Sequence, residues 1–388
     1  MSEVPPRTIA VLTTGRQDWG ILRSVCAAIR DEPGLSLALV AGGMHLSPRH
    51  GRSIQHVEAD GFELAAAIPW LADDPTAADP PASAQAAIVV DRIGAWLEVA
   101  APDALVLVAD RFETAAAALA ATLTRVPIVH LHGGEQTLGA FDDQLRHAIT
   151  KLAHLHLVSH EEHRWRVIAL GEDPKIVHVV GAPGLDNLYR PDLPDLAELG
   201  ESLGLPLEPP IVAVTVHPAT LDADPTADAR AVAAAMDVVP ATYVVSLPNV
   251  DPSAAEVAAI MRAAAAAPGR VAVEALGERR YWGLLRVADA VLGNSSSGIV
   301  EAPAVRLPAV NVGDRQVGRR REANVIDVPA EVEAVVAGLR RALDPAFRPT
   351  LREPDGALVD GRAGERAARI IAAWQPPRPP RKAPITAV

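Results

Sequence analysis

Residues 288–301 read Ala-Asp-Ala-Val-Leu-Gly-Asn-Ser-Ser-Ser-Gly-Ile-Val-Glu, and this stretch decides the fold class. Its first five residues form a short apolar run typical of a buried parallel strand. Three serines follow, and the pattern after them favours a helix that ends near Pro303. Hydroxyls, free backbone N–H groups and the positive end of a helix dipole would meet there, which suits a phosphate or diphosphate. A plain helix-capping cluster is the alternative, because Ser and Asn are ordinary capping residues.

The composition is that of a globular protein with two or three domains. The chain has 388 residues, of which 49 % are hydrophobic, and its formal net charge is −12. Such an acidic chain is not expected to bind nucleic acid through a basic surface. A phosphorylated ligand would need cations gathered locally, and Arg315, Arg319, Arg320 and Arg321 form one such cluster.

Other features favour a cytoplasmic protein. The single cysteine, Cys26, lies in an apolar helical pattern and is expected to be a buried structural thiol. The apolar run at residues 9–12 is broken by residues 13–16, so we interpret it as a first strand and not as a signal peptide. No run of about 18 apolar residues occurs, and no membrane span is expected.

Strands and helices alternate along the whole chain. Apolar runs predict strands in the first half at residues 9–12, 35–40, 104–108, 127–131, 155–158 and 177–180, and in the second half at 211–216, 242–247, 271–274, 288–292 and 309–312. Helical patterns separate most of them, which indicates right-handed βαβ units and parallel sheets. The predicted fold class is therefore α/β, with two doubly wound Rossmann-like domains.

The domain boundaries follow from composition. We expect an N-terminal domain at residues 1–188, a proline-rich linker at 189–210 and a C-terminal, nucleotide-binding domain at 211–356. Residues 357–375 are expected to form a helix that packs back across the domains. The Pro-, Arg- and Lys-rich residues 376–388 are expected to be a disordered tail.

Polar clusters follow many of the predicted strands. In open α/β sheets, ligands bind outside the carboxyl ends of the strands, so one cleft shared by two such sheets would gather these clusters. They lie at residues 14–16, 42–45, 110–113, 132–135, 217, 249 and 294–297.

Carboxylates dominate the clusters of the first half. Asp110-Arg111-Phe112-Glu113 follows one strand, and its alternative interpretation is a capping box with Asp110 as the cap. His132-Gly133-Gly134-Glu135 follows the next strand, and its two glycines allow a close approach of the backbone to a ligand. Asp142 and Asp143 open a helix that also carries Arg146 and His147. Clustered carboxylates push one another's pKa values apart, which lets one site supply both an acid and a base.

The second half contributes a histidine but no metal motif. His217 ends a predicted strand, where a histidine can donate to a phosphate, although a lone histidine is more often structural. No His/Cys spacing resembles a zinc site, and neither a Walker A loop nor a Gly-x-Ser-x-Gly elbow occurs. We therefore expect no metal and no cofactor.

These motifs together resemble the hydrolysing UDP-N-acetylglucosamine 2-epimerases of sialic-acid-type sugar pathways. The resemblance spans residues 9 to about 328. The matching stretches are residues 15–20, 43–48, 110–113, 130–135, 146–151, 181–187, 293–303 and 310–316.

The resemblance implies a fold and a reaction. The fold is the glycosyltransferase-B type, with the active site between the domains and a homodimer or homotetramer as the assembly. In the reaction, UDP leaves C1 of the sugar while the proton at C2 is removed, which gives a 2-acetamidoglucal. Water then adds at C1 and C2 is protonated from the other face, so that UDP and N-acetylmannosamine are released from UDP-N-acetylglucosamine.

The resemblance also implies residue roles. Asp110, Glu135 and Asp143 would transfer protons and stabilise positive charge on the sugar, and His217 would act on the departing diphosphate. Glu301 would hold the ribose. The substrate-binding set implied in this way is Arg16, Asp18, His45, Arg111, Glu113, His132, Asp142, Arg146, His147, Asn249, Ser295, Ser296, Ser297, Gly298, Glu301 and Arg315.

Departures from the family pattern leave the sugar open. Ala109 stands where the family usually has glycine, and Asp143 where a glutamate is more usual. Pro252-Ser253 replaces a usual glycine pair. A UDP-2,4-diacetamido-2,4,6-trideoxy sugar is therefore an alternative substrate, and a non-hydrolysing 2-epimerase or a glycosyltransferase is an alternative activity.

Overall fold

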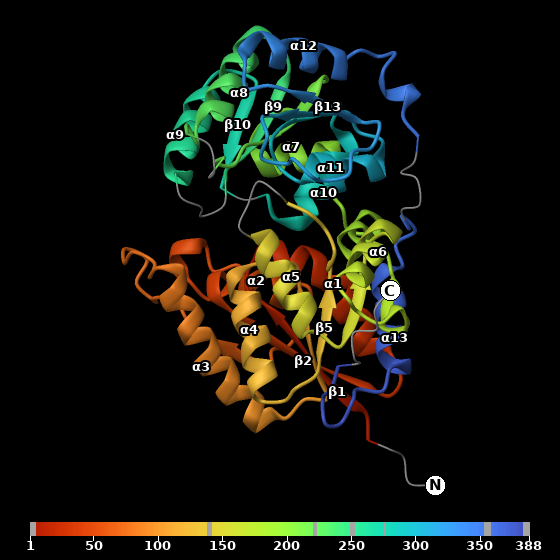
Figure 1. The fold of residues 1–388 in the computed structure, drawn as a ribbon. Helices are drawn as coiled ribbons and strands as arrows, with labels where there is room; N and C mark the ends of the chain where they lie inside the picture. Colours follow the sequence, from red (N-terminus) through yellow and green to blue (C-terminus); the bar gives the residue numbers. More distant parts are fainter. Residues whose placement is uncertain are drawn as a thin grey trace. The chain divides into compact units, whose positions relative to one another are not determined.

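The computed structural model describes residues 5–137, 142–219, 223–248, 253–274, 276–352 and 358–382. The chain divides into two compact units, which are coloured along the sequence in Figure 1. Unit 1 comprises Met1–Glu135, Phe141–Tyr189 and Gly356–Val388, and unit 2 comprises Gln136–Ala140 and Arg190–Asp355. Each unit contains one parallel sheet flanked by helices, which confirms the predicted fold class.

Unit 1 is built on a seven-stranded parallel sheet in the order β3-β2-β1-β4-β5-β6-β7. The order reverses between β1 and β4, and this position is the switch point where α/β proteins bind ligands. The strands are β1 (Arg7–Thr13), β2 (Leu35–Gly42), β3 (Ala66–Ile68), β4 (Ala104–Val108), β5 (Ile128–Leu131), β6 (Leu155–Val158) and β7 (Val177–Val179).

Helices cover both faces of this sheet (Figure 1). One core layer joins the strands to α1 (Arg16–Asp31), α2 (Ile54–Ala59) and α13 (Ala363–Ala373). The other joins them to α3 (Ala82–Ala100), α4 (Phe112–Leu123) and α5 (Asp142–Leu152), while α6 (Glu161–Ala169) packs on β7. Cys26 lies fully buried in the first layer, as predicted, and burial raises the pKa of its thiol.

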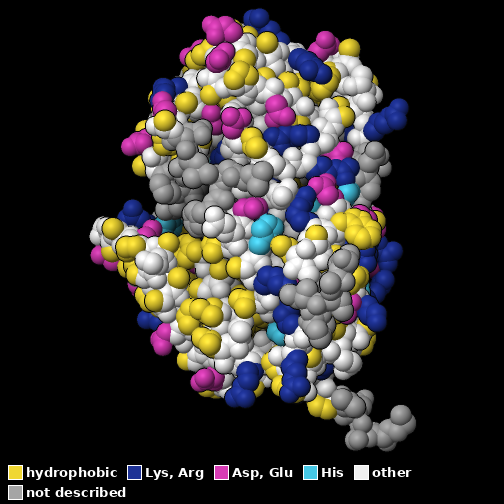
Figure 2. Space-filling model, in the orientation of Figure 1, with side chains coloured by type: hydrophobic (Ala, Val, Ile, Leu, Met, Phe, Trp, Pro, Cys, Tyr) yellow, Lys and Arg dark blue, Asp and Glu magenta, His cyan; other side chains and the backbone are white. Residues whose placement is uncertain are grey.

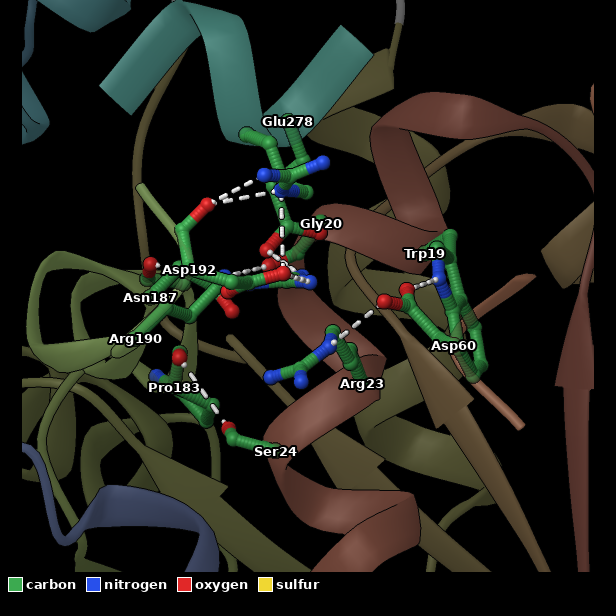
Figure 3. Close-up of polar contacts among 12 residues, drawn as sticks. Trp19, Gly20, Arg23, Ser24, Asp60, Pro183, Asn187, Arg190, Asp192 and Glu278 are labelled. Carbon is green, nitrogen blue, oxygen red and sulfur yellow. Dashed lines mark hydrogen bonds and ion pairs between the residues drawn. The ribbon is translucent and has the colours of Figure 1, made fainter. Parts of the chain in front are cut away.

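Helix α1 is tied to its neighbours by buried polar contacts (Figure 3). The Trp19 indole N–H donates to Asp60 at 2.8 Å, and the Asn187 side chain donates to the Gly20 carbonyl at 2.6 Å. These contacts hold the helix that begins with Arg16, just after the carboxyl end of β1. They also give a structural role to Asn187, which ends one of the matching motifs.

Unit 2 repeats the same plan with a six-stranded parallel sheet in the order β10-β9-β8-β11-β12-β13. Its switch point lies between β8 and β11. The strands are β8 (Ile211–Thr215), β9 (Thr242–Ser246), β10 (Arg270–Val273), β11 (Ala290–Gly293), β12 (Ala309–Val312) and β13 (Val325–Val328).

The core of unit 2 lies between its sheet and α8 (Ala227–Val238), α9 (Ala254–Ala264) and α12 (Val332–Ala342). Helices α7 (Leu196–Leu203) and α10 (Gly277–Val287) contact each other, and α11 (Ser297–Val300) is a single turn. Arg190 is 7 % exposed and pairs with both Asp192 and Glu278, which ties the start of the unit to α10 (Figure 3).

Short 3-10 helices occupy several loops. They are η1 (Gly43–His45), η2 (Pro48–His50), η3 (Pro174–Ile176), η4 (Pro183–Tyr189), η5 (Ala302–Val305) and η6 (Arg348–Thr350).

The segment predicted as a linker contains helix α7. Asp195 accepts from the backbone N–H groups of Ala197 and Glu198, and Glu198 accepts from the backbone of Asp195, which completes a capping box. Gly204 then ends the helix in the left-handed conformation, with φ 65°. The sequence signals that start and stop α7 are thus both present. The surrounding prolines nevertheless make this stretch resemble a linker.

Lys382, in the segment that the sequence predicts to be a disordered tail, makes several contacts with unit 1. The Lys382 ammonium donates to the carbonyls of Thr150 and Lys151 and pairs with Glu172 at 2.6 Å. Burial alone would raise the pKa of Glu172, but hydrogen bonds from His156, Lys151 and Lys382 outweigh it and hold this pKa at about 2. A buried carboxylate that needs cations explains why this part of a basic tail is held in place.

Hydrophobic side chains reach the surface over α3 and α4 (Figure 2). Val99, Leu119 and Leu123 are the large exposed ones there. None of the helices in the described ranges is long and apolar enough to cross a membrane.

Candidate functional site

The switch point of unit 1 brings two predicted clusters to adjacent strand ends. Strands β1 and β4 pair in parallel, with Ile9 opposite Ala104. The loop that contains Thr14 follows β1, and Asp110 follows β4 after one residue. The carboxyl ends of parallel strands meet at one sheet edge, so these loops are neighbours.

Arg146 joins two of the predicted catalytic carboxylates. Its guanidinium pairs with Asp110 through Nη2 and with Asp143 through Nη1, the latter at 3.2 Å. Arg146 is 2 % exposed and projects from α5, whereas Asp110 follows β4. His147 lies beside Asp143, with its Nε2 at 3.5 Å from Oδ2. One buried cation therefore holds two carboxylates side by side, because a planar guanidinium can donate to two acceptors at once.

The neighbouring acids are held by local contacts. The Arg111 guanidinium contacts the buried Glu113 carboxylate at 3.0 Å. The Asp18 carboxylate accepts from both the backbone N–H and the hydroxyl of Thr14, at 2.8 and 2.5 Å. Burial raises the pKa of Asp18 to about 6, against the opposing effects of the Arg111 charge and the Thr14 hydrogen bonds. Asp18 thus stabilises the loop after β1. Arg16 and Asp142 are the first residues of α1 and α5, respectively.

Glu135 is held by residues from two different loops. Its Oε1 lies 2.6 Å from His132 Nδ1 and accepts from the Ser159 hydroxyl at 3.2 Å. Ser159 Oγ in turn lies 2.9 Å from His163 Nδ1. His132 has φ 60°, a left-handed conformation that histidine tolerates better than most residues. The result is a connected string of four side chains across the ends of β5 and β6.

His45 is enclosed by the protein itself. Its Nε2 lies 2.8 Å from the Thr13 hydroxyl and its Nδ1 lies 3.0 Å from the Ser53 hydroxyl. The side chain is fully buried, and burial lowers its pKa to about 4. Both ring nitrogens are engaged, which favours a structural role over the ligand contact that the resemblance implies.

In unit 2, Asn294 joins the two sides of the switch point. Its Oδ1 accepts from the His217 backbone N–H at 2.7 Å, and its Nδ2 donates to the His217 carbonyl at 2.8 Å and to Asp228 at 2.7 Å. Gly293 lies beside β8, where an added Cβ would come within 2.0 Å of the Thr215 carbonyl oxygen. Only glycine allows this approach, so the position of His217 depends on the turn that begins the serine run.

The helix after the serine run is shorter than the sequence predicts. Helix α11 has four residues, and η5 follows after one residue, Glu301. A single turn carries little macrodipole, so backbone N–H groups and hydroxyls must supply most of any anion stabilisation there. Ser295 and Ser296 precede α11, and Ser297 and Gly298 form its first turn.

Glu301 ends α11 and lies near Tyr281 of α10. Burial, and then the Glu301 charge, raise the pKa of Tyr281 well above its usual value. Arg315 donates to the Asn294 carbonyl at 3.2 Å, and Gln316 donates to the same oxygen at 2.9 Å. The Arg315 side chain thus supports the serine turn by binding the backbone carbonyl of Asn294.

Two of the four arginines in the predicted cluster are paired with acids. Arg320 contacts Glu322 at 2.9 Å and Arg321 contacts Asp327 at 3.0 Å. These ion pairs offset the positive charge that the sequence suggested was gathered for a phosphate. Asn249, the remaining predicted binding residue, lies outside the described residues.

Several residues of these sites were not predicted from the sequence. Ser159 and His163 in unit 1, and Asp228 and Gln316 in unit 2, contact predicted residues directly or through one neighbour. For Ser159 a signal existed, because it follows the strand at residues 155–158. Within the described ranges, no group of three or more His, Cys, Asp or Glu side chains is arranged to hold a metal ion.

Comparisons with known proteins agree on one family. The family model described as UDP-N-acetylglucosamine 2-epimerase matches residues 27–372. A relative from Campylobacter jejuni, named GDP/UDP-N,N'-diacetylbacillosamine 2-epimerase (hydrolyzing), is 33 % identical over 83 % of this chain and 84 % of its own. The UDP-N,N'-diacetylbacillosamine 2-epimerase (hydrolyzing) of Legionella pneumophila is 31 % identical over 94 % of this chain and 95 % of its own.

A solved structure supports the fold. The UDP-GlcNAc 2-epimerase of Neisseria meningitidis bound to UDP-GlcNAc matches with a TM-score of 0.78 and 13 % identity, over 95 % of this chain and 100 % of that one. From the family match and the relatives above 30 % identity, the chain belongs to the UDP-N-acetylglucosamine 2-epimerase family, as the resemblance in its sequence predicted.

Proposed function

We propose that this protein is a hydrolysing 2-epimerase of a UDP-2-acetamido sugar. The observation that carries the proposal is the pairing of both Asp110 and Asp143 with one buried cation, Arg146, while Glu135 is held in the loop after the neighbouring strand β5. Two carboxylates in the loops after β4 and β5, and a third at the start of α5, suit a reaction that needs both proton transfer and stabilisation of positive charge.

The chemistry explains why carboxylates are needed. The hydrogen at C2 of the sugar is not acidic, so cleavage of the bond between C1 and the diphosphate must lead, and the sugar ring gains positive charge. A carboxylate stabilises that charge, and another removes the C2 proton to form the 2-acetamidoglucal. Water then adds at C1, and C2 receives a proton on the opposite face. The sum is UDP-sugar plus water giving UDP plus the free manno-configured sugar, without a redox cofactor.

The three carboxylates share these tasks. Arg146 holds Asp110 and Asp143 close together and offsets their mutual repulsion, which keeps two negative groups available to one sugar. Glu135 lies in a separate loop, after β5, and is oriented by His132 and Ser159. Asp143 is one methylene shorter than the glutamate usual in the family, and its ion pair with Arg146 fixes where that shorter carboxylate lies.

Residues of unit 2 would bind the diphosphate and the ribose. Backbone N–H groups and hydroxyls of Ser295 and Ser296, together with His217, would stabilise the departing diphosphate. Glu301 would accept hydrogen bonds from the ribose hydroxyls. No metal ion is required in this scheme, because donors from the protein neutralise the leaving group.

For the sugar, we favour UDP-2,4-diacetamido-2,4,6-trideoxyglucose, which is UDP-N,N'-diacetylbacillosamine. The support is that the Campylobacter and Legionella relatives described above are named for diacetylbacillosamine, as its GDP or UDP derivative in the first and as its UDP derivative in the second. UDP-N-acetylglucosamine, which the sequence alone favoured, is the second candidate, because it is the sugar nucleotide in the structurally similar Neisseria enzyme.

The test is an NMR time course in D2O with each UDP-sugar in turn. The expected outcome is release of UDP together with the free manno-configured sugar carrying deuterium at C2. Release of the epimerised sugar still attached to UDP would instead assign the non-hydrolysing reaction. Turnover of neither sugar by protein that binds UDP would overturn the proposal. Mass photometry of the same sample tests the homodimer or homotetramer that the resemblance implies.

A further inference from the structure

We propose that Ser159 and His163 are positioning residues that orient the Glu135 carboxylate and stabilise its charged form. The inference rests on the proposed function, in which Glu135 acts on the sugar. Neither residue lies in a motif that carries the family resemblance.

The string runs from a helix through a strand end to the carboxylate. Ser159 follows β6 directly, and His163 lies one helical turn further along, in the first turn of α6. The distances are 2.9 Å from His163 Nδ1 to Ser159 Oγ and 3.2 Å from Ser159 Oγ to Glu135 Oε1. The first distance is ordinary for a hydrogen bond between nitrogen and oxygen, and the second is long for one between two oxygens. His163 therefore reaches Glu135 through a single hydroxyl.

The number of available hydrogens determines which atoms donate and which accept along this string of side chains. A serine hydroxyl has one hydrogen, so if Ser159 donates to the Glu135 carboxylate it must accept from His163. His163 then carries its proton on Nδ1. Burial lowers the pKa of His163 to about 4, against the opposing charge of Glu135, and so His163 is neutral at neutral pH with one N–H. The other charged or titratable groups that act on it are Arg166, His132 and His160.

Helix α6 also holds the loop that carries Glu135. Gly134 has φ 78°, and a Cβ added there would lie 2.4 Å from the His163 carbonyl oxygen, so the loop rests directly on the helix backbone. The Arg166 guanidinium donates to the Gly134 carbonyl. The same turn of α6 therefore fixes the loop by its backbone and the carboxylate by its side chain.

Glu135 Oε1 receives contacts from two sides. His132 Nδ1 approaches from its own loop, and Ser159 approaches from β6. Donors to a carboxylate favour its charged form, and they restrict its rotation. Removal of Ser159 or of the His163 donor should therefore free the carboxylate to rotate and make it easier to protonate, while the substrate contacts elsewhere remain.

The experiment compares Ser159→Ala, Ser159→Thr, His163→Leu and His163→Asn. Asn can place its side-chain N–H near the position of histidine Nδ1, whereas Leu cannot donate. We expect Ser159→Ala and His163→Leu to lower kcat by about 10-fold with KM changed less than about twofold, as for the loss of one charge-assisted hydrogen bond. The acidic limb of the kcat profile should move to higher pH by about half to one pH unit. Ser159→Thr and His163→Asn should retain most of the activity.

A matched control is Ser24→Ala. The Ser24 hydroxyl donates to the Pro183 carbonyl at 3.1 Å in the same unit, away from Glu135. This variant should leave both kcat and the pH profile unchanged. If Ser159→Ala behaves like Ser24→Ala, or if His163→Asn is as impaired as His163→Leu although both variants melt like the wild type, the inference is overturned.

A second readout separates this inference from the proposed function. Nitrogen-15 NMR of labelled histidines in the wild-type protein should show His163 protonated at Nδ1, and protonation at Nε2 would contradict the inference. Carbon-13 NMR of labelled glutamates, assigned with Glu135→Gln, should show Glu135 titrating at higher pH in Ser159→Ala than in the wild type. These measurements need no turnover, so a wild-type protein inactive on both UDP-sugars would sink the proposed function while still testing the positioning role.

Discussion

The Asn294 side chain hydrogen-bonds both the backbone N–H and the backbone carbonyl of His217. Its Oδ1 accepts the His217 N–H at 2.7 Å and its Nδ2 donates to the His217 carbonyl at 2.8 Å, although the two residues are 77 positions apart. The same Nδ2 reaches the buried Asp228 at 2.7 Å. Asn294 is 0 % exposed, so each of these contacts lies away from water and its loss is costly.

Asn294→Asp should destabilise unit 2. The substitution replaces the Nδ2 donor by an oxygen, which then faces both the His217 carbonyl and the Asp228 carboxylate. We expect a loss of about 3 kcal/mol in the free energy of unfolding, as for a buried group that loses its partner. Urea unfolding measures it. Asp228→Asn in the same chain should recover part of the loss by restoring a donor, and a double variant no more stable than the single one would show that this contact is not the cause.

Arg146→Lys should reduce activity strongly while preserving the charge. The guanidinium reaches Asp110 and Asp143 with two different nitrogens, whereas a lysine ammonium is a single point that cannot match that geometry. A displaced carboxylate costs on the order of 100-fold in kcat. Steady-state release of UDP measures it.

The matched control is Arg164→Lys. Arg164 lies on α6, and its side chain donates to the Val177 carbonyl of β7 at 3.1 Å. It touches no predicted catalytic residue. Equal activities of Arg146→Lys and Arg164→Lys would refute the view that the shared guanidinium organises the site.

Asp18 should make stability fall between pH 4 and pH 6. Burial raises its pKa from 3.8 to about 6, so in this window the folded state keeps a proton that the unfolded state has released. The folded state binds more protons, and the free energy of unfolding therefore decreases as pH rises, by about 3 kcal/mol in total for this group.

Asp18→Asn removes this dependence. Relative to the wild type, the variant should gain about 3 kcal/mol between pH 4 and pH 7, as measured by urea unfolding followed by tryptophan fluorescence. Stability curves of the two proteins that run parallel from pH 4 to pH 7 would mean that Asp18 is not the residue responsible.

Ala109→Gly should stabilise the protein. Ala109 has φ 60°, and a residue with a Cβ costs about 1 kcal/mol or more in the left-handed region, whereas glycine adopts it freely. Glycine is also the residue that the family resemblance in the sequence implies at this position. Ala101→Gly is the control, because Ala101 has φ 43° at the end of α3 and lies outside the predicted site. We expect both variants to raise the unfolding midpoint in thermal melts, and a lower midpoint for either would contradict the argument from φ.

The sequence predicted the elements better than the contacts. Apolar runs located most strands, because a strand buried on both faces must be apolar over its whole length. Strands β3 and β13 were missed: each lies at an edge of its sheet, and β3 has only three residues. Helix α7 was missed because prolines around it outweighed its capping box.

For the sites, the sequence alone determined which polar residues follow strands, and hence that Asp110, Glu135, His217 and the serine run belong to loops at the ligand-binding edges of two parallel sheets. It also determined the family. That much is local, because strand periodicity, glycine turns and motif spacing are all written within a few neighbouring residues.

Only the tertiary structure decided the partners. The strand order sets β4 beside β5, which is followed by α5, and β8 beside β11, and this brings Asp110 to Arg146 and Asn294 to His217. It also encloses His45 and places Ser159 and His163 behind Glu135. Hydrogen bonds and ion pairs depend on distances of a few ångströms between residues far apart in the chain, and those distances exist only once the sheets have formed.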